Sequence, residues 1–314
     1  MPVNRTLSGR INLLRIPLPA KILTALVLFF ASSHTVTQTN VAAQQLSFGA
    51  DPDENRVAVR FITKKDRISE TDSPFWVGLH MDIKEGWHVY WRNPGDSGLP
   101  TRITWSDSDD VEPGEIHWPL PSRFDEEGIT TYGYSDEVTL LIPVSLSRMP
   151  ITGESIALEA NVQWLVCKDI CIPESARVPF EIGGRGELQG LVDHGGDRIS
   201  GALSLLPQPS DAWSAEAFVA ERELTLDIRP ESAPAIMPNP ENVYFYPYHQ
   251  GVIEHTAPQK VSVSDEKLTL TLQVSRYYNS GISEIRGVLV TGTSWIEGES
   301  HTGLEISAEI IPTY

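Results

Sequence analysis

The sequence has little positive charge, few cysteines and no long apolar run beyond its first 43 residues. Lys and Arg number 24 against 42 Asp and Glu, which gives a formal charge of −18. A surface this acidic repels phosphate backbones, so nucleic-acid binding is excluded. No later window approaches 18 apolar residues, which excludes a membrane-spanning helix there. The sequence also contains no Ser-His-Asp motif, glycine-rich phosphate loop or zinc-protease motif.

The first 43 residues have the composition of an export signal. Arg5, Arg10, Arg15 and Lys21 precede the apolar run 22–31, and the segment has no acid. Such a run spans about 15 Å as a helix, half of a bilayer core, so it is too short to anchor the chain. The small residues Val41-Ala42-Ala43 suit a signal peptidase. We expect cleavage near Ala43 and a periplasmic protein; the alternative is an uncleaved amphipathic N-terminus.

Short strands separated by turns dominate the rest of the chain. Residues 156–166 alternate strictly, with apolar side chains at even positions and polar ones at 159, 161 and 163. This pattern predicts a half-buried strand of an antiparallel sheet. Further strands are expected at 57–63, 75–83, 87–91, 138–144, 223–229, 243–248, 267–274, 285–291 and 304–310. No βαβ alternation is present, so the sequence predicts an all-β fold of sandwiches or barrels.

One stretch interrupts the strand pattern. Residues 183–186 are rich in glycine, 199–206 predict a short helix, and prolines follow at 207 and 209. We interpret 183–210 as a linker between two β-domains, at 46–182 and 211–314.

The two cysteines, Cys167 and Cys171, are the strongest candidates for chemistry. Four residues of continuous strand cover about 13 Å, whereas a disulfide needs Cα atoms about 5.5–6 Å apart, so the chain must turn at the pair. A five-residue loop gains only about 2 kcal/mol from the bridge, and a domain of this size folds without it. Three interpretations stay open: redox exchange, a structural disulfide, and metal binding by thiolates. Lys168 and Asp169 act on a thiol pKa in opposite directions.

The segment around the pair, Gln163-Trp-Leu-Val-Cys-Lys-Asp-Ile-Cys-Ile-Pro-Glu174, carries a family resemblance. It resembles the active segment of the N-terminal periplasmic domain of DsbD and ScsB thiol:disulfide interchange proteins. Residues 86–100 (Gly-Trp-His-Val-Tyr-Trp-Arg-Asn-Pro-Gly-Asp-Ser-Gly-Leu-Pro) and 245–254 (Phe-Tyr-Pro-Tyr-His-Gln-Gly-Val-Ile-Glu) resemble stretches of the ScsB-like branch. The resemblance extends over about 48–312.

This resemblance implies two immunoglobulin-like antiparallel β-sandwich domains, the first carrying a redox-active pair. Cys171 would be the attacking thiol and Cys167 the resolving one. Electrons would come from a membrane-embedded donor of the DsbD/CcdA type and pass to periplasmic thioredoxin-like or disulfide-isomerase proteins, as in cytochrome c biogenesis. Long family members continue into transmembrane helices and a thioredoxin-like domain, whereas this sequence ends at Tyr314. We therefore expect a relay module that relies on a separate membrane protein.

The family also implies an aromatic cap loop over the cysteines, which best matches 124–134. Its candidate capping residues are Phe124, Tyr132 and Tyr134, because Thr131 stands where better-known members carry Phe. Which of these aromatics covers the pair stays open.

Three further residues are expected to line the site. Trp87 and Trp91 alternate with His88 and Tyr90, so the tryptophans should face the core and the other two the cysteines. Trp164, close to the pair in sequence, is the third candidate.

No cofactor beyond the cysteine pair is expected, although Cu(I) would suit soft thiolates and the copper tolerance associated with ScsB. Histidines 80, 88, 117, 249 and 255 show no close ligand spacing. The alternative function is a non-catalytic module for copper handling or protein assembly.

Overall fold

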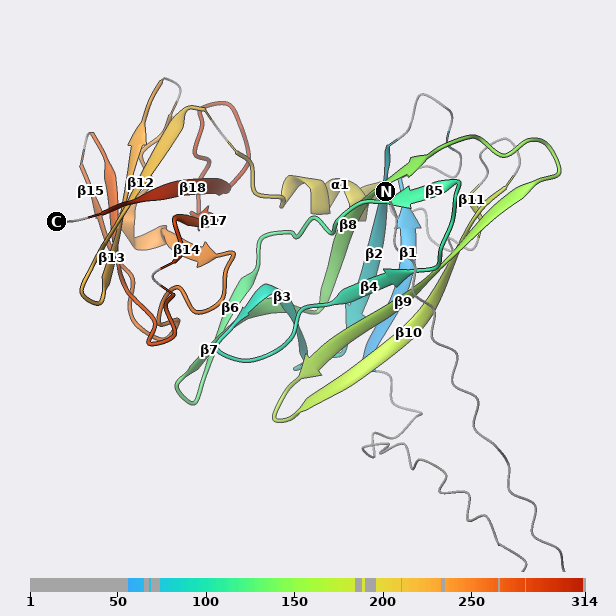
Figure 1. Ribbon diagram of the computed structural model, residues 1–314, viewed down its shortest axis with the longest axis horizontal. Coiled ribbons are helices and arrows are strands. Elements are labelled where there is room, and N and C mark those ends of the chain that lie inside the picture. The colour runs from blue at the N-terminus through green and yellow to red at the C-terminus, as the bar shows by residue number, and fades with distance from the viewer. Residues whose placement is uncertain are drawn as a thin grey trace, which may run out of the picture. The chain divides into compact units, whose positions relative to one another are not determined.

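The computed structural model describes residues 56–64, 68, 74–183, 188–189, 196–209, 211–232, 235–264, 266–279 and 281–312. The expected signal peptide lies outside these residues. Nearly all regular structure in the described part is β, apart from the helix α1 (Gly196–Ser204) and the 3-10 helix η3 (Pro240–Asn242) (Figure 1). No helix in it is long and apolar enough to cross a membrane. The all-β prediction is confirmed.

The first sandwich consists of a four-stranded and a seven-stranded sheet. The smaller sheet has the order β1-β2-β8-β5, and the larger has the order β11-β10-β9-β3-β7-β6 with β4 paired to β9. The strands are β1 (Val57–Thr63), β2 (Phe75–Ile83), β3 (His88–Gly95), β4 (Arg102–Trp105), β5 (Val111–Pro113), β6 (Ser122–Glu126), β7 (Ile129–Ser135), β8 (Glu137–Leu146), β9 (Ser155–Cys167), β10 (Cys171–Gly183) and β11 (Leu188–Gln189).

Alternating side chains of both sheets form the core of this sandwich. The even-numbered residues of β9 from Ile156 to Val166 are buried, whereas most odd ones are exposed, as the sequence predicts. Phe61 of β1 lies 5.1 Å from the ring of Trp105 and 6.3 Å from that of Phe180, measured between centroids. Trp91 of β3 is 1% exposed, so its predicted core position is confirmed.

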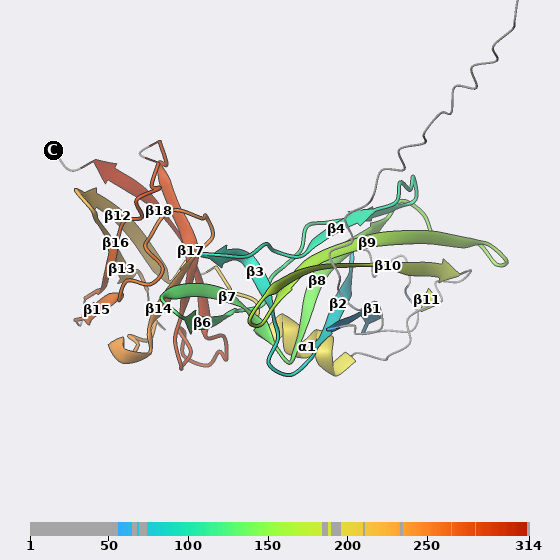
Figure 2. The same ribbon diagram turned by 90° about the horizontal axis from the view of Figure 1, so that it is seen from below.

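Helix α1 lies within the stretch predicted as a linker. Its buried residues Ile199 and Ala202 pack with Ile62 and Leu141 of the four-stranded sheet. Gly78 makes this approach possible, because a Cβ atom there would lie 2.6 Å from the Ile199 side chain. The helix thus covers the outer face of that sheet (Figure 2).

The second sandwich has a seven-stranded arrangement in the order β14-β17-β18-β12-β13-β16-β15. Its strands are β12 (Trp213–Ala220), β13 (Glu223–Pro230), β14 (Tyr244–Pro247), β15 (Lys260–Val263), β16 (Leu268–Gln273), β17 (Glu284–Val290) and β18 (Gly303–Pro312). The sandwich has its own core, which contains Phe245 and Trp295. One pairing departs from the antiparallel expectation, since β12 and β18 run parallel. Both sandwiches belong to one compact unit.

Strand β10, which the sequence did not predict, is an edge strand for most of its length. Among the described strands, β11 pairs with it only at Glu181 and Ile182, and β9 occupies its other side. Its first half alternates between exposed and half-buried positions and includes Pro173, so it lacks the apolar pattern of an interior strand.

Candidate functional site

The cysteines form a cross-strand disulfide at the end of the β9–β10 hairpin. Cys167 is the last residue of β9, Cys171 is the first of β10, and the two are directly opposite in the register. Their Cα atoms are 4.1 Å apart and their sulfurs are bonded. Residues 168–170 make the turn, closed by a 3.2 Å hydrogen bond from the Lys168 N–H to the Ile170 carbonyl. The predicted turn at the pair is therefore present.

The two cysteines differ strongly in exposure. Cys167 is 2% exposed because β9 lies between β10 and β3 in the sheet. Cys171 begins the edge strand and is exposed. This difference leaves Cys171 as the sulfur that another molecule can reach.

His88 and Tyr90 of β3 lie beside the disulfide, on the same face of the sheet. His88 is directly opposite Cys167 in the register, and Tyr90 lies two residues further along β3. The Tyr90 hydroxyl donates a 3.5 Å hydrogen bond to the Cys171 sulfur. Burial raises the pKa of Tyr90 to about 12, so the hydroxyl keeps its proton at neutral pH.

The expected cap loop is a β-hairpin, formed by β6 and β7, which we call the cap hairpin (Ser122–Ser135). Glu127 and Gly128 connect the strands with φ of 49° and 82°, the signs that a two-residue hairpin turn needs. Phe124 is opposite Thr131, and Glu126 is opposite Ile129. The loop expectation was wrong because exposed, polar β6 has no apolar alternation.

Phe124 is the aromatic residue of the cap hairpin that reaches the site. Its ring stacks on His88 with a centroid distance of 4.8 Å and an interplanar angle of 16°. His88 in turn meets Tyr90 edge-on at 5.2 Å. Thr131, the position where a Phe was expected, lies across the register from Phe124 and lines the cavity beside the cysteines. The resemblance indicates an aromatic residue at position 131 of β7, and the structure has one at Phe124, directly opposite on β6.

Tyr132 and Tyr134 do not reach the cysteines, contrary to the sequence-based expectation. Successive side chains of a strand point to opposite faces, so both tyrosines face away from Thr131. The Tyr132 hydroxyl lies 3.0 Å from both the Tyr244 hydroxyl and Nδ1 of His255, in the second sandwich. The Tyr134 hydroxyl donates a 2.7 Å hydrogen bond to the Pro119 carbonyl.

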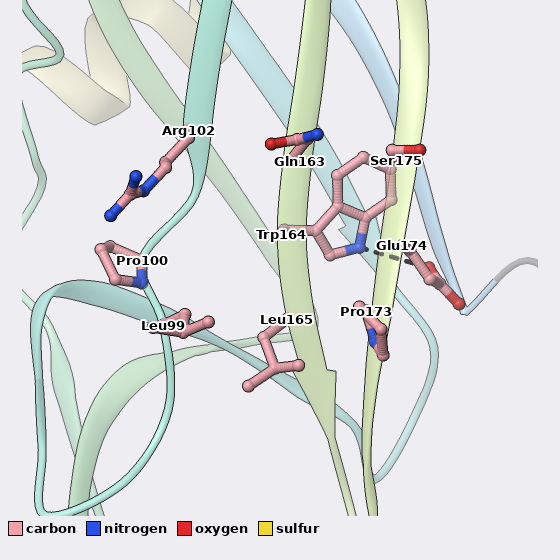
Figure 3. Close-up of a pocket in the computed structure, with 9 residues that line it drawn as sticks. All are labelled: Leu99, Pro100, Arg102, Gln163, Trp164, Leu165, Pro173, Glu174 and Ser175. Atoms are coloured by element: carbon pink, nitrogen blue, oxygen red, sulfur yellow. Dashed lines mark hydrogen bonds between the residues drawn. The ribbon is translucent and has the colours of Figure 1, made fainter. Parts of the chain in front are cut away.

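Trp164 is also directed away from the disulfide, because it belongs to the core-facing positions of β9. Its indole N–H donates a 3.2 Å hydrogen bond to Glu174. Figure 3 shows this bond and the residues that line a neighbouring cavity, among them Trp164, Leu99 and Pro100. The volume of this cavity is about 500 Å³. Neither cysteine lines that cavity.

A cavity of about 670 Å³ contains the disulfide. Both cysteines line it, together with His88 and Tyr90 of β3 and residues from the tip of the cap hairpin. The sequence patterns do not indicate the tip residues Glu126, Ile129 and Thr131 or the turn residue Lys168 as lining residues. A hairpin prediction for 122–135 would indicate the tip residues, because Glu126, Ile129 and Thr131 lie on the same face of the hairpin as Phe124.

The electrostatics of the cavity keep its histidine neutral. Burial lowers the pKa of His88, and the negative charge of Glu126 opposes this less strongly. Nε2 of His88 is buried and has no hydrogen-bond partner among the described residues. The site therefore holds an uncharged imidazole next to the disulfide.

A group of possible metal ligands occurs away from the disulfide. His80, Asp82 and Glu137 offer ligand atoms within 4.8 Å of one another. Asp82 also pairs with Arg60, and Glu137 lies 3.4 Å from Nε of Arg198. The group contains no thiol, so it does not correspond to the thiolate copper site considered from the sequence.

Comparisons with known proteins agree with this geometry. Residues 58–180 match the family described as thiol:disulfide interchange protein DsbD, N-terminal. The match extends from β1 to β10 of the first sandwich. The crystal structure of the N-terminal periplasmic domain of ScsB from Proteus mirabilis is similar, with a TM-score of 0.57. The two chains are 22% identical, over 83% of this chain and 96% of that one.

The remaining comparisons add little. The YadV chaperone aligns over 81% of this chain and 100% of its own at 10% identity, but its TM-score of 0.21 supports no shared architecture. No curated protein matches the chain. The similarity of the first sandwich to DsbD therefore rests on the family match, and the shared fold rests on the ScsB structure.

Proposed function

We propose that the protein is a periplasmic relay for thiol:disulfide interchange that works through Cys167 and Cys171. The observation that carries this proposal is the unequal exposure of the two sulfurs in one cavity: Cys167 is 2% exposed, and Cys171 is exposed. Exchange needs one sulfur that a partner can reach and a second that resolves the mixed disulfide. The DsbD-type family of residues 58–180 supports the same chemistry.

In the reduced protein, the Cys171 thiolate attacks one sulfur of a partner disulfide and forms a mixed disulfide. The partner's other sulfur leaves as a thiolate. The Cys167 thiolate then attacks the Cys171 sulfur, and the partner's first sulfur leaves. The partner has gained two electrons, and Cys167–Cys171 is again a disulfide. A donor dithiol reduces the pair by the reverse sequence.

Tyr90 supports the attacking sulfur. Its hydroxyl, 3.5 Å from the Cys171 sulfur, is a protonated donor that stabilises the thiolate more than the thiol. Such a bond favours the thiolate of Cys171, which is the form that attacks the disulfide of a partner. The cap hairpin lines the same cavity, so its tip must move when a partner occupies that space.

The partners follow from the family and are part of the proposal. A membrane-embedded dithiol protein of the DsbD/CcdA type would supply electrons, and periplasmic thioredoxin-like or isomerase proteins would accept them. The periplasmic location is supported by the fold shared with the ScsB periplasmic domain and by the signal-like residues 1–43.

The decisive test is equilibration of the purified protein with glutathione buffers, followed by mass spectrometry of alkylated thiols. We expect a single two-electron transition above about −300 mV, the range of exchangeable disulfides. A pair that is more strongly reducing than this would instead be structural.

Trapping identifies the attacking sulfur. The reduced Cys167→Ser variant should form a stable mixed disulfide with oxidised glutathione through Cys171. The Cys171→Ser variant should form little, because Cys167 is buried. A stronger adduct in the Cys171→Ser variant would reverse the roles.

Titration with Cu(I), before and after the thiols are blocked, addresses the copper alternative. The relay proposal expects no stoichiometric Cu(I) complex that survives competition with glutathione. A stable complex that requires both thiols would favour copper handling.

A further inference from the structure

His88 occupies a position that the exchange scheme above does not use. Its backbone pairs with Cys167, and directly opposed residues in a sheet have Cβ atoms about 4.5–5.5 Å apart on the same face. The ring is held between Phe124, stacked at 4.8 Å, and Tyr90, edge-on at 5.2 Å. The imidazole is therefore fixed in orientation beside the buried cysteine.

One ring nitrogen of His88 lacks a hydrogen-bond partner in the described part of the chain while the two cysteines form a disulfide. His88 is 7% exposed, and its Nε2 has no hydrogen-bond partner among the residues that the structure describes. A buried polar atom without a partner is unfavourable, and such atoms need an explanation. The Cys167 sulfur has no proton in the disulfide, but it gains one on reduction, so a donor for the imidazole then appears next to it.

The resolving step requires that proton to leave. Cys167 is buried, and burial in apolar surroundings raises the pKa of a thiol. Only the thiolate attacks the mixed disulfide at Cys171. A buried thiol without a nearby base would be slow at neutral pH.

We propose that His88 is the proton acceptor for Cys167 in the resolving step, and that the orphaned imidazole of the disulfide state accepts a hydrogen bond from this thiol when the pair is reduced. The inference rests on the proposed exchange function and assigns the base within it. Nε2 takes the thiol proton as the Cys167 sulfur bonds to the Cys171 sulfur. The partner's sulfur leaves with the bonding electron pair, and the imidazolium returns the proton to solvent or to the leaving thiolate.

The charged groups around the ring are consistent with this role. Glu126, from the cap hairpin, acts on His88 and stabilises the imidazolium. Glu127, Lys168 and Asp169 line the same cavity, and Tyr90 packs against the ring. Three carboxylates, those of Glu126, Glu127 and Asp169, therefore outnumber the one lysine among the described residues that line the cavity, which favours a positive charge on the ring.

The two steps separate in a reaction with 5,5′-dithiobis(2-nitrobenzoate). Attack by Cys171 releases the first nitrothiobenzoate at a rate proportional to reagent concentration. Attack by Cys167 releases the second at a rate independent of concentration. Stopped-flow absorbance from pH 5.5 to 9.5 measures both rates in the reduced full chain.

In His88→Phe, which retains the ring stack, we expect the second phase to slow roughly tenfold at pH 7, because a thiol of ordinary pKa near 8.5 is only a few per cent ionised there. The difference from the unmodified protein should shrink steadily as the pH is raised to 9.5, because a growing fraction of the thiol then ionises without help. The first phase should change by less than about twofold. His88→Gln, which hydrogen-bonds but is no base at these pH values, should behave like His88→Phe.

His117→Phe is the matched control, since it removes an exposed imidazole that does not line the cavity of the disulfide. It should keep the unmodified pH profile of the second phase. Identical profiles in the His88 variants and the unmodified protein would overturn the assignment of His88 while leaving the exchange function intact. A second phase absent from every protein, including the unmodified one, would instead contradict the exchange function.

One measurement needs no variant. Reduction of the disulfide should move the imidazole NMR resonances of His88 and change their titration, because the ring gains the Cys167 thiol as a partner. Unchanged resonances on reduction would also overturn the inference.

Discussion

The tip and the base of the cap hairpin are only a few residues apart, yet they are held in different ways. At the base, Tyr132 is fully buried and its hydroxyl is within 3.0 Å of Tyr244 and His255. Arg123 lies over the Tyr244 ring at 5.0 Å. At the tip, Glu126, Glu127 and Ile129 are exposed. The second sandwich thus holds the base, while Phe124 on His88 is the aromatic contact near the tip.

This difference shows how one hairpin serves two purposes. A base fixed by burial and hydrogen bonds cannot open without a large loss of stability, whereas an exposed tip bends at low cost. Access to the cavity is therefore expected to be controlled by the tip alone. The second sandwich contributes to the site by holding the base in place.

The largest effect is expected from breaking the base. Tyr132→Ala removes a fully buried aromatic side chain, so the free energy of unfolding should fall by about 3–5 kcal/mol in urea titrations. Tyr132→Phe should lose about 1–3 kcal/mol, because Tyr244 and His255 lose a partner. Glu126→Ala at the tip is the control and should stay within about 0.5 kcal/mol. Equal losses at tip and base would contradict the comparison.

A smaller effect is expected from loosening the tip. Phe124→Ala removes the stack on His88, so the single thiol of a Cys171→Ser background should react with iodoacetamide about tenfold faster. In a Cys167→Ser background the same change should accelerate Cys171 by less than about threefold, because Cys171 is already exposed. If the Cys167 rate did not change, the cap hairpin would not act as a lid.

Lowering the pH should reduce the stability of the hairpin base, by less than the changes above. Burial lowers the pKa of His255, opposed by the charges of Asp96 and Glu254. The unfolded chain therefore binds more protons below about pH 6.5, and stability is lost as the pH falls through that value. We expect urea midpoints to fall by an equivalent of about 1 kcal/mol between pH 7.5 and 5. His80 and His88, whose pKa values burial also lowers, act in the same direction.

The variant His255→Gln separates the contribution of His255 from that of the other two histidines. Its midpoint should depend less steeply on pH than that of the unmodified protein. If the urea midpoint of His255→Gln depended on pH as steeply as that of the unmodified protein, His255 would not contribute to the pH dependence.

The smallest effect is expected at the turn of the tip. Glu127 has a φ of 49°, in the left-handed region that Asn tolerates better than Glu. Glu127→Asn should stabilise the hairpin by about 0.5 kcal/mol and slow alkylation of Cys167 about twofold. Gly128→Ala, at a φ of 82°, should act in the opposite direction. If both changes had the same sign, the tip would not control access.

The sequence predicted the parts of the fold that depend on strict alternation. The even positions of β9 are apolar along its length, and this predicted both the buried face and the position of Cys167 at its end. The turn at the pair followed from disulfide geometry alone. His88 and Tyr90 were placed correctly because their alternation with Trp87 and Trp91 is clear.

The cap hairpin could not be predicted from apolar alternation. Its first strand is polar and solvent-exposed, so it carries no apolar period, and the sequence pattern predicts a loop there. In a loop any aromatic residue can turn towards the cysteines. In a strand successive side chains point to opposite faces of the sheet, so Thr131 and Tyr132 cannot both face the cysteines. The contacts of Tyr132 with Tyr244 and His255 join residues more than a hundred positions apart, and no local pattern indicates them.

Strand β10 carries the exposed cysteine along an open sheet edge, which is ordinarily a template for association with another chain. Pro173 and Pro179 lie an even number of residues apart in this strand, so their nitrogens face the same side. Neither can donate a hydrogen bond, and within a sheet proline is accommodated where its nitrogen faces the unpaired side. An incoming strand would therefore find no backbone donor at Pro173, two residues from Cys171, and none at Pro179, further along the strand. The edge of β10 is therefore a poor template for fibre-like self-association, although it carries an exposed cysteine at its first position.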